Sequence, residues 1–259
     1  GAALATIIAQ TVSAVWVLKF LLGSKTILRI RKENMSVQGA VIFPVLALGL
    51  SPFIMTSTES LLNICFNTSL QKYGGDLAVG TMTILSSCMQ VCSLPLQGLA
   101  QGAQPIVSYN FGAKNLSRVK EAFRLLFVSA ICASSVIWMI AIFIPGFFPS
   151  LFSNDQELIA YASWAIRIYL GMAFVMGAQM SCQQTFVAIG EAKISLFLAL
   201  FRKIIVLIPL IYLLPNFFAD KVFAVFLAEP VADTMAALTT TTLFFRKFRK
   251  LSRDMEWAG

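Results

Sequence analysis

Long apolar stretches alternate with short polar connections along the whole chain. Seven of these stretches reach the length of about 20 residues that a helix needs to cross the hydrocarbon core of a bilayer. Pro and Gly interrupt several of them, which membrane helices tolerate because neighbouring helices satisfy the freed backbone groups. The pattern predicts an all-α, polytopic membrane helix bundle with seven transmembrane helices, at residues 1–23, 46–70, 77–104, 122–148, 158–188, 194–215 and 222–245.

The composition excludes most other classes of protein. Hydrophobic residues make up 58% of the 259 residues and charged residues only 12%, whereas soluble domains have about 45–50% and about 25%. A disordered chain would show the opposite bias, with low hydrophobicity and high net charge. The absence of histidine excludes the common zinc sites and His-based catalytic triads. Without a Walker A motif or a recognisable hydrolytic site, we expect neither an enzyme nor a cofactor.

Basic residues concentrate in alternate connections between the apolar stretches. One set of connections, together with the C-terminal tail, holds thirteen Lys and Arg, whereas the opposite set holds only Lys72 and Lys221. This positive-inside bias predicts that the first set and the C-terminus are cytoplasmic. The net charge of +8 therefore needs no nucleic-acid partner. The thirteen are Lys25, Arg29, Arg31, Lys32, Lys114, Arg118, Lys120, Lys193, Arg246, Lys247, Arg249, Lys250 and Arg253.

One polar connection stands out as a linker. Residues 24–36 are polar and basic, and we expect them to separate a first helix at 1–23 from a helical lobe at 37–245, with a basic cytoplasmic tail at 246–259. The chain opens on Gly1 without a basic region, so the first stretch does not resemble a signal peptide. The odd number of helices, the external N-terminus and the missing initiator Met predict that the chain is a fragment.

A stripe of polar side chains follows one face of the second stretch. Thr56, Glu59, Ser60, Asn63 and Asn67 fall within an arc of about 100° on a helix. A charge in mid-bilayer costs at least about 2.5–3.5 kcal/mol, so the stripe faces protein or water rather than lipid. We interpret it as a cavity wall on which Glu59 binds a cation or a proton. The alternative is a hydrogen-bonded seam between helices, which we favour for each asparagine taken singly.

Other ionisable residues lie in the last three stretches. Glu229 and Asp233 are one helical turn apart in the seventh, Arg167 lies in the fifth, and Arg202 and Lys203 lie in the sixth. These residues form either a structural network of ion pairs or a network that acts in gating and coupling. Alternatively, the side chains of Arg202 and Lys203 extend toward the cytoplasmic interface of the membrane. Three glutamines of the fifth stretch are expected to bond to neighbouring helices: Gln179, Gln183 and Gln184.

The sequence Gln-Gly-Ala-Gln-Pro-Ile-Val-Ser-Tyr-Asn-Phe-Gly-Ala-Lys-Asn at 101–115 resembles the motif that closes the eighth helix of the multidrug and toxic compound extrusion (MATE) family. The similarity is greatest to the family's bacterial multidrug exporters. Weaker matches to the family occur in the same order along nearly the whole chain, before and after this motif, at 48–63, 72–76, 167–193, 195–215 and 229–233. The motif residues are Gln104, Pro105, Tyr109, Asn110 and Gly112.

The resemblance implies helices six to twelve of a twelve-helix antiporter, which is the C-terminal lobe and the helix before it. Such a protein exports small organic cations across the bacterial cytoplasmic membrane in exchange for protons or sodium. The missing N-terminal lobe is then expected in the same polypeptide. As a mechanism, we expect deprotonated Glu59 to attract a lipophilic cation in competition with a proton, while the two lobes rock to alternate access.

Two departures from the family pattern limit which coupling residues of the family are assigned to this chain. The first-helix acid of proton-coupled members belongs to the missing helices, and Met176 stands where sodium-linked members have an Asp. Only Glu59 and, more weakly, Asp233 are carried over as coupling acids. The alternatives are a lipid-linked oligosaccharide flippase, which would line its cavity with more buried bases, and a non-transporting scaffold. A seven-helix retinal protein lacks its Schiff-base Lys in 222–245.

Overall fold

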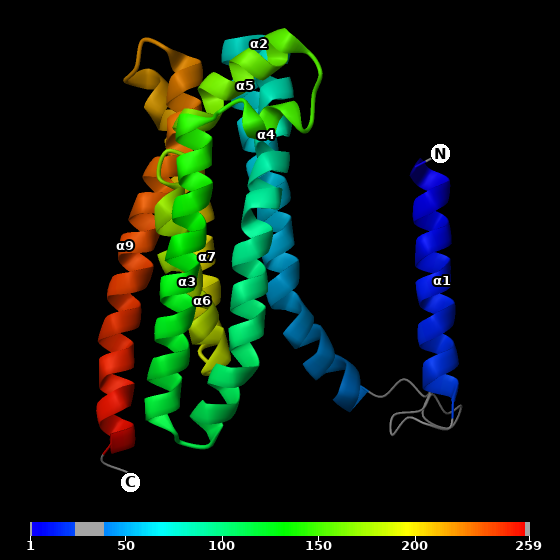
Figure 1. Ribbon diagram of the computed structural model, residues 1–259, viewed down its shortest axis with the longest axis vertical. Coiled ribbons are helices and arrows are strands. Elements are labelled where there is room, and N and C mark those ends of the chain that lie inside the picture. The colour runs from blue at the N-terminus through cyan, green and yellow to red at the C-terminus, as the bar shows by residue number, and fades with distance from the viewer. Residues whose placement is uncertain (1, 24–38, 257–259) are drawn as a thin grey trace. The chain divides into compact units, whose positions relative to one another are not determined.

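The computed structural model describes residues 2–23 and 39–256, and these are almost entirely helical, with no strand among them (Figure 1). They fall into two units, Gly1–Leu50 and Ser51–Gly259. The first unit contains helix α1 (Ala2–Leu22), in which apolar residues predominate. The predicted linker at 24–36 lies outside the described residues.

The second unit contains the rest of the helical elements, and its boundary with the first falls inside helix α2. The last helix, α9, continues beyond the predicted end of the seventh stretch into the basic tail. The elements after α1 are α2 (Gly39–Gly112), α3 (Leu116–Phe143), α4 (Phe147–Ser150), α5 (Gln156–Tyr169), η2 (Ala173–Val175), α6 (Met176–Ala188), α7 (Ala192–Leu200), η3 (Phe201–Leu207), α8 (Ile208–Leu213), η4 (Leu214–Asn216) and α9 (Lys221–Glu256).

Helix α2 folds back on itself at a single residue. Gly75 has φ 65° and ψ −159°, a region of backbone conformation that is essentially restricted to glycine. Gln71 Nε2 donates a hydrogen bond to Asp76 Oδ1 across this break (3.0 Å). The two arms on either side of Gly75 run side by side in Figure 1. The chain therefore reverses direction at Gly75, in the short connection between the predicted stretches 46–70 and 77–104.

Five helices are long and apolar enough to cross a membrane, and a bent pair of helices qualifies as a further span. One of the five, Phe53–Gly112, has 60 residues, which as a straight helix would extend about 90 Å, three times the core thickness of about 30 Å. Because the chain reverses at Gly75, this segment supplies two crossings. The described segments thus accommodate the seven predicted crossings, and the all-α membrane bundle is confirmed.

The fifth stretch, predicted as one span at 158–188, is broken. Helices α5 and α6 meet at an angle of 53° across a short interruption. The interruption frees backbone carbonyls, and side chains of α3 satisfy two of them. Trp138 Nε1 donates to the Gly171 carbonyl (2.7 Å) and Ser134 Oγ donates to the Phe174 carbonyl (2.9 Å). The break is therefore held by hydrogen bonds from another helix, as a buried non-helical backbone in a membrane requires.

The sixth stretch also departs from a regular α-helix. The segment η3 is a π-helix, and the Ile208 N–H donates to the Lys203 carbonyl five residues earlier. Pro209 follows directly, and its ring nitrogen has no hydrogen to donate to the carbonyl of Ile205. Single π-helical turns occur frequently at functional sites. This turn carries the two adjacent bases of the stretch, Arg202 and Lys203.

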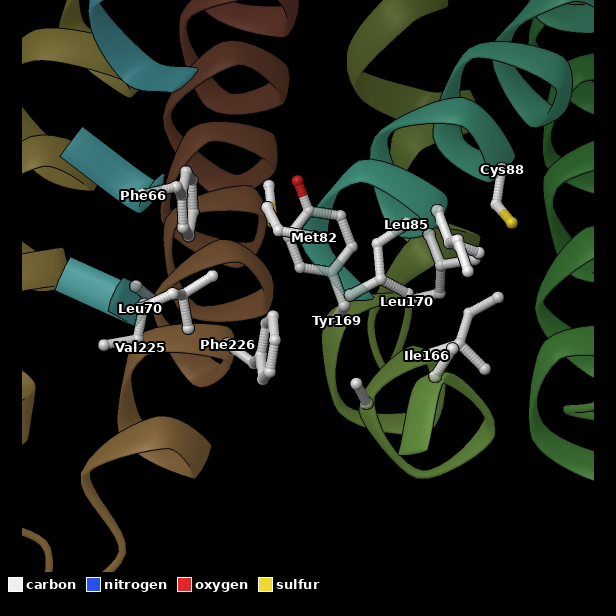
Figure 2. Packing of buried hydrophobic residues seen from close by; sticks show 14 of the residues in the cluster. Phe66, Leu70, Met82, Leu85, Cys88, Ile166, Tyr169, Leu170, Val225 and Phe226 are labelled. Carbon is white, nitrogen blue, oxygen red and sulfur yellow. The ribbon is translucent and has the colours of Figure 1, made fainter. Parts of the chain in front are cut away.

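The main hydrophobic core is formed by both arms of α2 together with α5, η3 and α9. Phe66, Tyr169 and Phe226 are buried in it, as Figure 2 shows, and the rings of Phe66 and Tyr169 meet edge to face with centroids 6.2 Å apart. Helix α3 packs closely against α6 at Gly177, where an added Cβ would lie 2.3 Å from the Ala130 carbonyl oxygen. This packing fixes the helices that surround the pocket described next.

Candidate functional site

A pocket of about 340 Å³ opens within the Ser51–Gly259 unit. Its wall is built by both arms of α2, by α6 and α7, by the π-helical turn η3 and by α9. Two carboxylates, Glu59 and Asp233, and two bases, Arg202 and Lys203, line it. Four of the ionisable residues that the sequence singled out inside the membrane therefore come together from three separate segments of the chain.

Glu59 forms an ion pair with Lys203. The Lys203 ammonium donates a hydrogen bond to Glu59 Oε1, which joins η3 to the first arm of α2. The two side chains differ in burial, because that of Lys203 is 11% exposed and that of Glu59 is 59% exposed. The carboxylate thus stands at the open side of the pocket, and the ammonium reaches it from the protein interior.

Arg202 binds two carboxylates of α9 at once. Its Nη2 lies 2.6 Å from Glu229 Oε1 and 2.5 Å from Asp233 Oδ1, and its Nε donates to Asp233 Oδ1 at 2.8 Å. Glu229 and Asp233 are buried, and Arg202 is nearly so. The planar guanidinium suits such multiple contacts with carboxylates. One guanidinium thus joins two acidic side chains of α9 beside the pocket.

The local sequence explains how two adjacent bases serve two different helices. Successive residues of a helix point in different directions, so Arg202 faces α9 while Lys203 faces α2. On α9, Glu229 and Asp233 are one turn apart and therefore share a face. Pro230 lies between them inside the helix, where it removes one backbone hydrogen bond. Both elements that carry the charges are thus irregular helices.

Amide and thioether side chains complete the pocket. Five glutamines line it, and three methionines, including Met176, supply its softer surface. Gln183 Nε2 donates to the Ser195 carbonyl (3.3 Å), so this glutamine bonds to a neighbouring helix as expected. Amides offer both donors and acceptors, and methionine adapts to varied shapes. The glutamines are Gln97, Gln101, Gln179, Gln183 and Gln184.

The remaining residues of the predicted stripe lie outside the pocket lining. Thr56, Ser60, Asn63 and Asn67 are exposed on the first arm of α2, and of the five residues of the stripe Glu59 alone lines the pocket. Arg167, predicted as a gating partner, is exposed on α5 and takes part in none of the ion pairs between described residues. A role in the site for Thr56, Asn63, Asn67 and Arg167 stays a prediction.

Sequence reasoning did not identify Lys203 as the partner of Glu59. The two residues are 144 positions apart, and nothing in the local pattern links them. The one available signal was the presence of an acid and a base inside membrane spans of the same bundle, since each requires a partner. The pairing of Arg202 with Glu229 agrees with the predicted set of ion pairs, although the sequence had assigned no partners within it.

The motif at 101–115 shapes the end of α2. Asn110 is buried, and its Nδ2 donates to the Ile106 carbonyl (2.8 Å), while Ser108 Oγ donates to the Ala188 carbonyl at the end of α6 (2.9 Å). The chain leaves the helix through Lys114, whose φ of 55° is left-handed. Four motif residues accompany Asn110 in this last part of the helix, namely Gln104, Pro105, Tyr109 and Gly112.

A larger groove of about 850 Å³ lies between the second arm of α2 and α3. Its surface is mainly apolar, and its charged residues are Arg118 and Glu121. A groove of this composition offers few groups that would orient a ligand, whereas the smaller pocket combines an apolar part with convergent polar groups. We therefore regard the smaller pocket as the candidate functional site.

Known proteins similar to this chain are transporters. A multidrug export protein, MepA, of Staphylococcus aureus (strain MSSA476) is 22% identical over 255 residues, which are 98% of this chain and 55% of the relative. A solved structure of the MATE multidrug transporter DinF-BH is 34% identical and has a TM-score of 0.77, over 95% of this chain and 55% of that one.

The fold is shared more widely than the sequence. A crystal structure of MATE in complex with MaL6 has a TM-score of 0.83 at only 17% identity, over 97% of this chain and 57% of that one. The chain thus spans little more than half the length of the relatives that it matches. The MatE family model matches residues 52–213, which include Glu59 and the π-helical turn. The chain therefore belongs to the MatE family of membrane transporters.

Proposed function

We propose that this chain is the C-terminal lobe of an antiporter that exports organic cations in exchange for protons or sodium. The observation that carries the proposal is the position of Glu59, a carboxylate on the open side of a pocket inside a membrane-spanning bundle. An ionisable group at such a position is a functional site by default, because an unpaired charge there is costly. Membership of the MatE family supports transport as the activity.

The accessible carboxylate of the pocket supports a cationic substrate. Glu59 and Asp233 line the pocket together with Arg202 and Lys203, and Glu59 is the more exposed of the two acids. The Glu59 carboxylate therefore stands at the open side of a cavity with apolar and thioether surfaces. Such a site attracts a lipophilic cation, and its methionines accept substrates of varied shape.

The exposed stripe on α2 supports a second lobe. Thr56, Asn63 and Asn67 accompany Glu59 on the exposed surface of the first arm, and polar groups at this depth require protein or water rather than lipid. A second lobe facing this stripe would enclose the pocket, and rocking of the two lobes would open it to either side of the membrane. We infer that the relatives' additional length corresponds to that lobe.

The proposed setting is the cytoplasmic membrane of a bacterium, with the C-terminus in the cytoplasm. The bias of Lys and Arg toward one set of connections supports this orientation. The coupling ion is a proton or sodium, and the ion and the substrate would compete for Glu59. Met176 lines the pocket at the position where a second acid would favour sodium, so the site offers sodium few oxygen ligands.

A lipid-linked oligosaccharide flippase is the second candidate, because two bases do line the pocket. Both bases are paired with carboxylates, however. A guanidinium held by two carboxylates and an ammonium held by a third have little capacity left for a pyrophosphate. The pairing therefore favours a cation as the substrate over an anionic lipid.

The test is ethidium efflux from energised, pump-deficient cells that express the native gene. Replacing Glu59 by Gln keeps the side-chain shape and removes its charge, and we expect efflux to fall by at least about tenfold, the factor that 1.4 kcal/mol of lost attraction produces. Collapse of the ion gradient should abolish efflux from the wild type.

The matched control is Glu157→Gln, because Glu157 is an exposed carboxylate in the first turn of α5, outside the pocket. At equal expression this variant should export ethidium as the wild type does. Efflux that survives Glu59→Gln would remove Glu59 from the coupling site. A wild type without efflux, which instead restores growth of cells that lack their lipid-linked oligosaccharide flippase, would favour the second candidate.

A further inference from the structure

We propose that Lys203 is a tethered cation that occupies the Glu59 carboxylate, and that a transported cation must displace its ammonium to bind there. The inference rests on the proposed function and identifies the residue that sets cation affinity at the same site. In the transporter without substrate, the Lys203 ammonium would then neutralise Glu59. It would occupy the position that the substrate or the coupling ion takes later in the transport cycle.

The geometry of the pair is that of an occupied cation site. Lys203 is buried, and its side chain extends from the π-helical turn to Glu59 at the open side of the pocket. Glu229 and Asp233 of α9 also lie beside η3, but Arg202 binds both of them. Among the described residues, Glu59 is the carboxylate in direct contact with the Lys203 ammonium.

The chemistry of lysine allows this contact to be released. An ammonium on a flexible four-carbon stem is a point charge that holds its partner without the fixed, forked geometry of a guanidinium. The adjacent Arg202 shows the opposite case, with a guanidinium fixed by two carboxylates. The π-helical turn therefore presents one fixed base and one exchangeable base to the same pocket.

Exchange is also possible on the Glu59 side. Its side chain is 59% exposed and borders a cavity of about 340 Å³, so a ligand reaches the carboxylate without unfolding any element. A cation that approaches Glu59 competes with the Lys203 ammonium for the same oxygens. The measured dissociation constant of a ligand thus equals the intrinsic value divided by the fraction of time that Lys203 leaves Glu59 free.

The first arm of the test measures ethidium binding to the purified native protein by fluorescence anisotropy. Truncating Lys203→Ala removes the competitor, and we expect the dissociation constant of ethidium to fall about tenfold, which corresponds to 1.4 kcal/mol. Lys203→Arg retains a competing cation beside Glu59. The dissociation constant of ethidium for this variant should therefore stay within about threefold of the wild-type value, well below the tenfold change that 1.4 kcal/mol produces.

A matched control is available elsewhere in the same chain. Lys247 Nζ lies 2.7 Å from Glu191 Oε1 in a partly exposed ion pair, and neither residue lines the pocket. Lys247→Ala therefore removes a Lys–Glu pair without changing the site, and the dissociation constant of ethidium should not change.

The second arm tests the cation site without any drug. Propylammonium supplies the atoms that Lys203→Ala deletes, so it should occupy the vacated position beside Glu59. We expect millimolar propylammonium to raise the thermal unfolding temperature of Lys203→Ala but not that of the wild type. The response should disappear in the double variant Lys203→Ala with Glu59→Gln, because the carboxylate that binds the ammonium is then absent.

The outcomes separate this inference from the proposed function. Tighter ethidium binding by Lys203→Ala, with the Glu59-dependent response to propylammonium, is the expected result. If ethidium binds to no variant while propylammonium still stabilises Lys203→Ala, the proposed export of organic cations is contradicted, whereas the role of Lys203 as a tethered cation is supported. Unchanged or weaker ethidium binding by Lys203→Ala, without a response to propylammonium, would overturn the inference and leave the proposed function intact.

Discussion

The ion pair between Glu59 and Lys203 joins two side chains whose requirements differ. Lys203 is buried and needs a counter-ion, because a buried charge without a partner is strongly destabilising. Glu59 is exposed at the pocket, so its carboxylate depends less on a counter-ion. The ion pair therefore mainly stabilises the charged form of Lys203 inside the bundle. This asymmetry leaves the carboxylate available to other cations.

Arg202 has a different task, which is to compensate two buried carboxylates. We predict that Arg202→Met lowers the free energy of unfolding by about 3 kcal/mol or more, as the removal of one partner from a buried ion pair does. The measurement is thermal unfolding of the native protein in detergent. The triple variant Arg202→Met, Glu229→Gln and Asp233→Asn should recover part of the loss, since it leaves no unpaired charge.

Arg167→Met is the control for this prediction. Arg167 is an exposed base of α5 outside the ion pairs between described residues, so its replacement should change the unfolding temperature little. Equal effects of the two single variants would show that the buried cluster contributes no more to stability than an exposed base.

The candidate site could be predicted from the sequence only as a set of residues. The acids and bases inside apolar stretches are visible because an ionisable group in a membrane span is rare and costly. Their pairing is not visible, because it depends on which helices become neighbours. Glu59 and Lys203 lie 144 positions apart, and the assignment of Arg202 to two acids of α9 follows from the packing of η3 against that helix.

At the scale of helices, the pocket depends on irregular elements that packing stabilises. The break between α5 and α6 places α6 beside the pocket, and the carbonyls that it frees are bonded by Trp138 and Ser134 of α3. Sequence analysis predicted one uninterrupted span here, since the apolar pattern is continuous and the bonding partners are more than 30 positions away. The π-helical turn escaped prediction for a similar reason.

Close packing of α3 on α6 gives a test at this scale. A Cβ on Gly177 would lie 2.3 Å from the Ala130 carbonyl oxygen and 2.6 Å from Ser134 Oγ. We predict that Gly177→Ala lowers the free energy of unfolding by about 1–3 kcal/mol, the usual cost of overpacking, and weakens ethidium binding because α6 carries pocket residues.

Gly98→Ala is the matched control on α2. A Cβ at Gly98 would meet no atom within 4 Å, and Ala has a higher helix propensity than Gly, so this variant should unfold at the temperature of the wild type or slightly above it. Thermal unfolding of both variants in the same detergent checks the pair of predictions. A Gly177→Ala protein as stable as Gly98→Ala would contradict the close helix contact.

For the whole molecule, composition and the spacing of apolar stretches predicted the membrane bundle correctly. The apolar length of each crossing is a property of its own sequence, and the reversal at Gly75 follows from a glycine pair between two such lengths. The positions of the bends could not be predicted, because each depends on acceptors and donors in another helix. Family membership rests on residues 52–213, and the second lobe is inferred from the length of the relatives.

The most direct test of cation antiport is transport by the purified native protein in proteoliposomes. A proton or a sodium gradient directed outward from the lumen is imposed, and the entry of ethidium is followed by fluorescence. The account predicts that ethidium accumulates in the lumen against its own gradient, that an ionophore for the coupling ion stops this accumulation, and that Glu59→Gln lacks it. Ethidium that equilibrates at the same rate with and without either gradient, or that never enters, would contradict antiport.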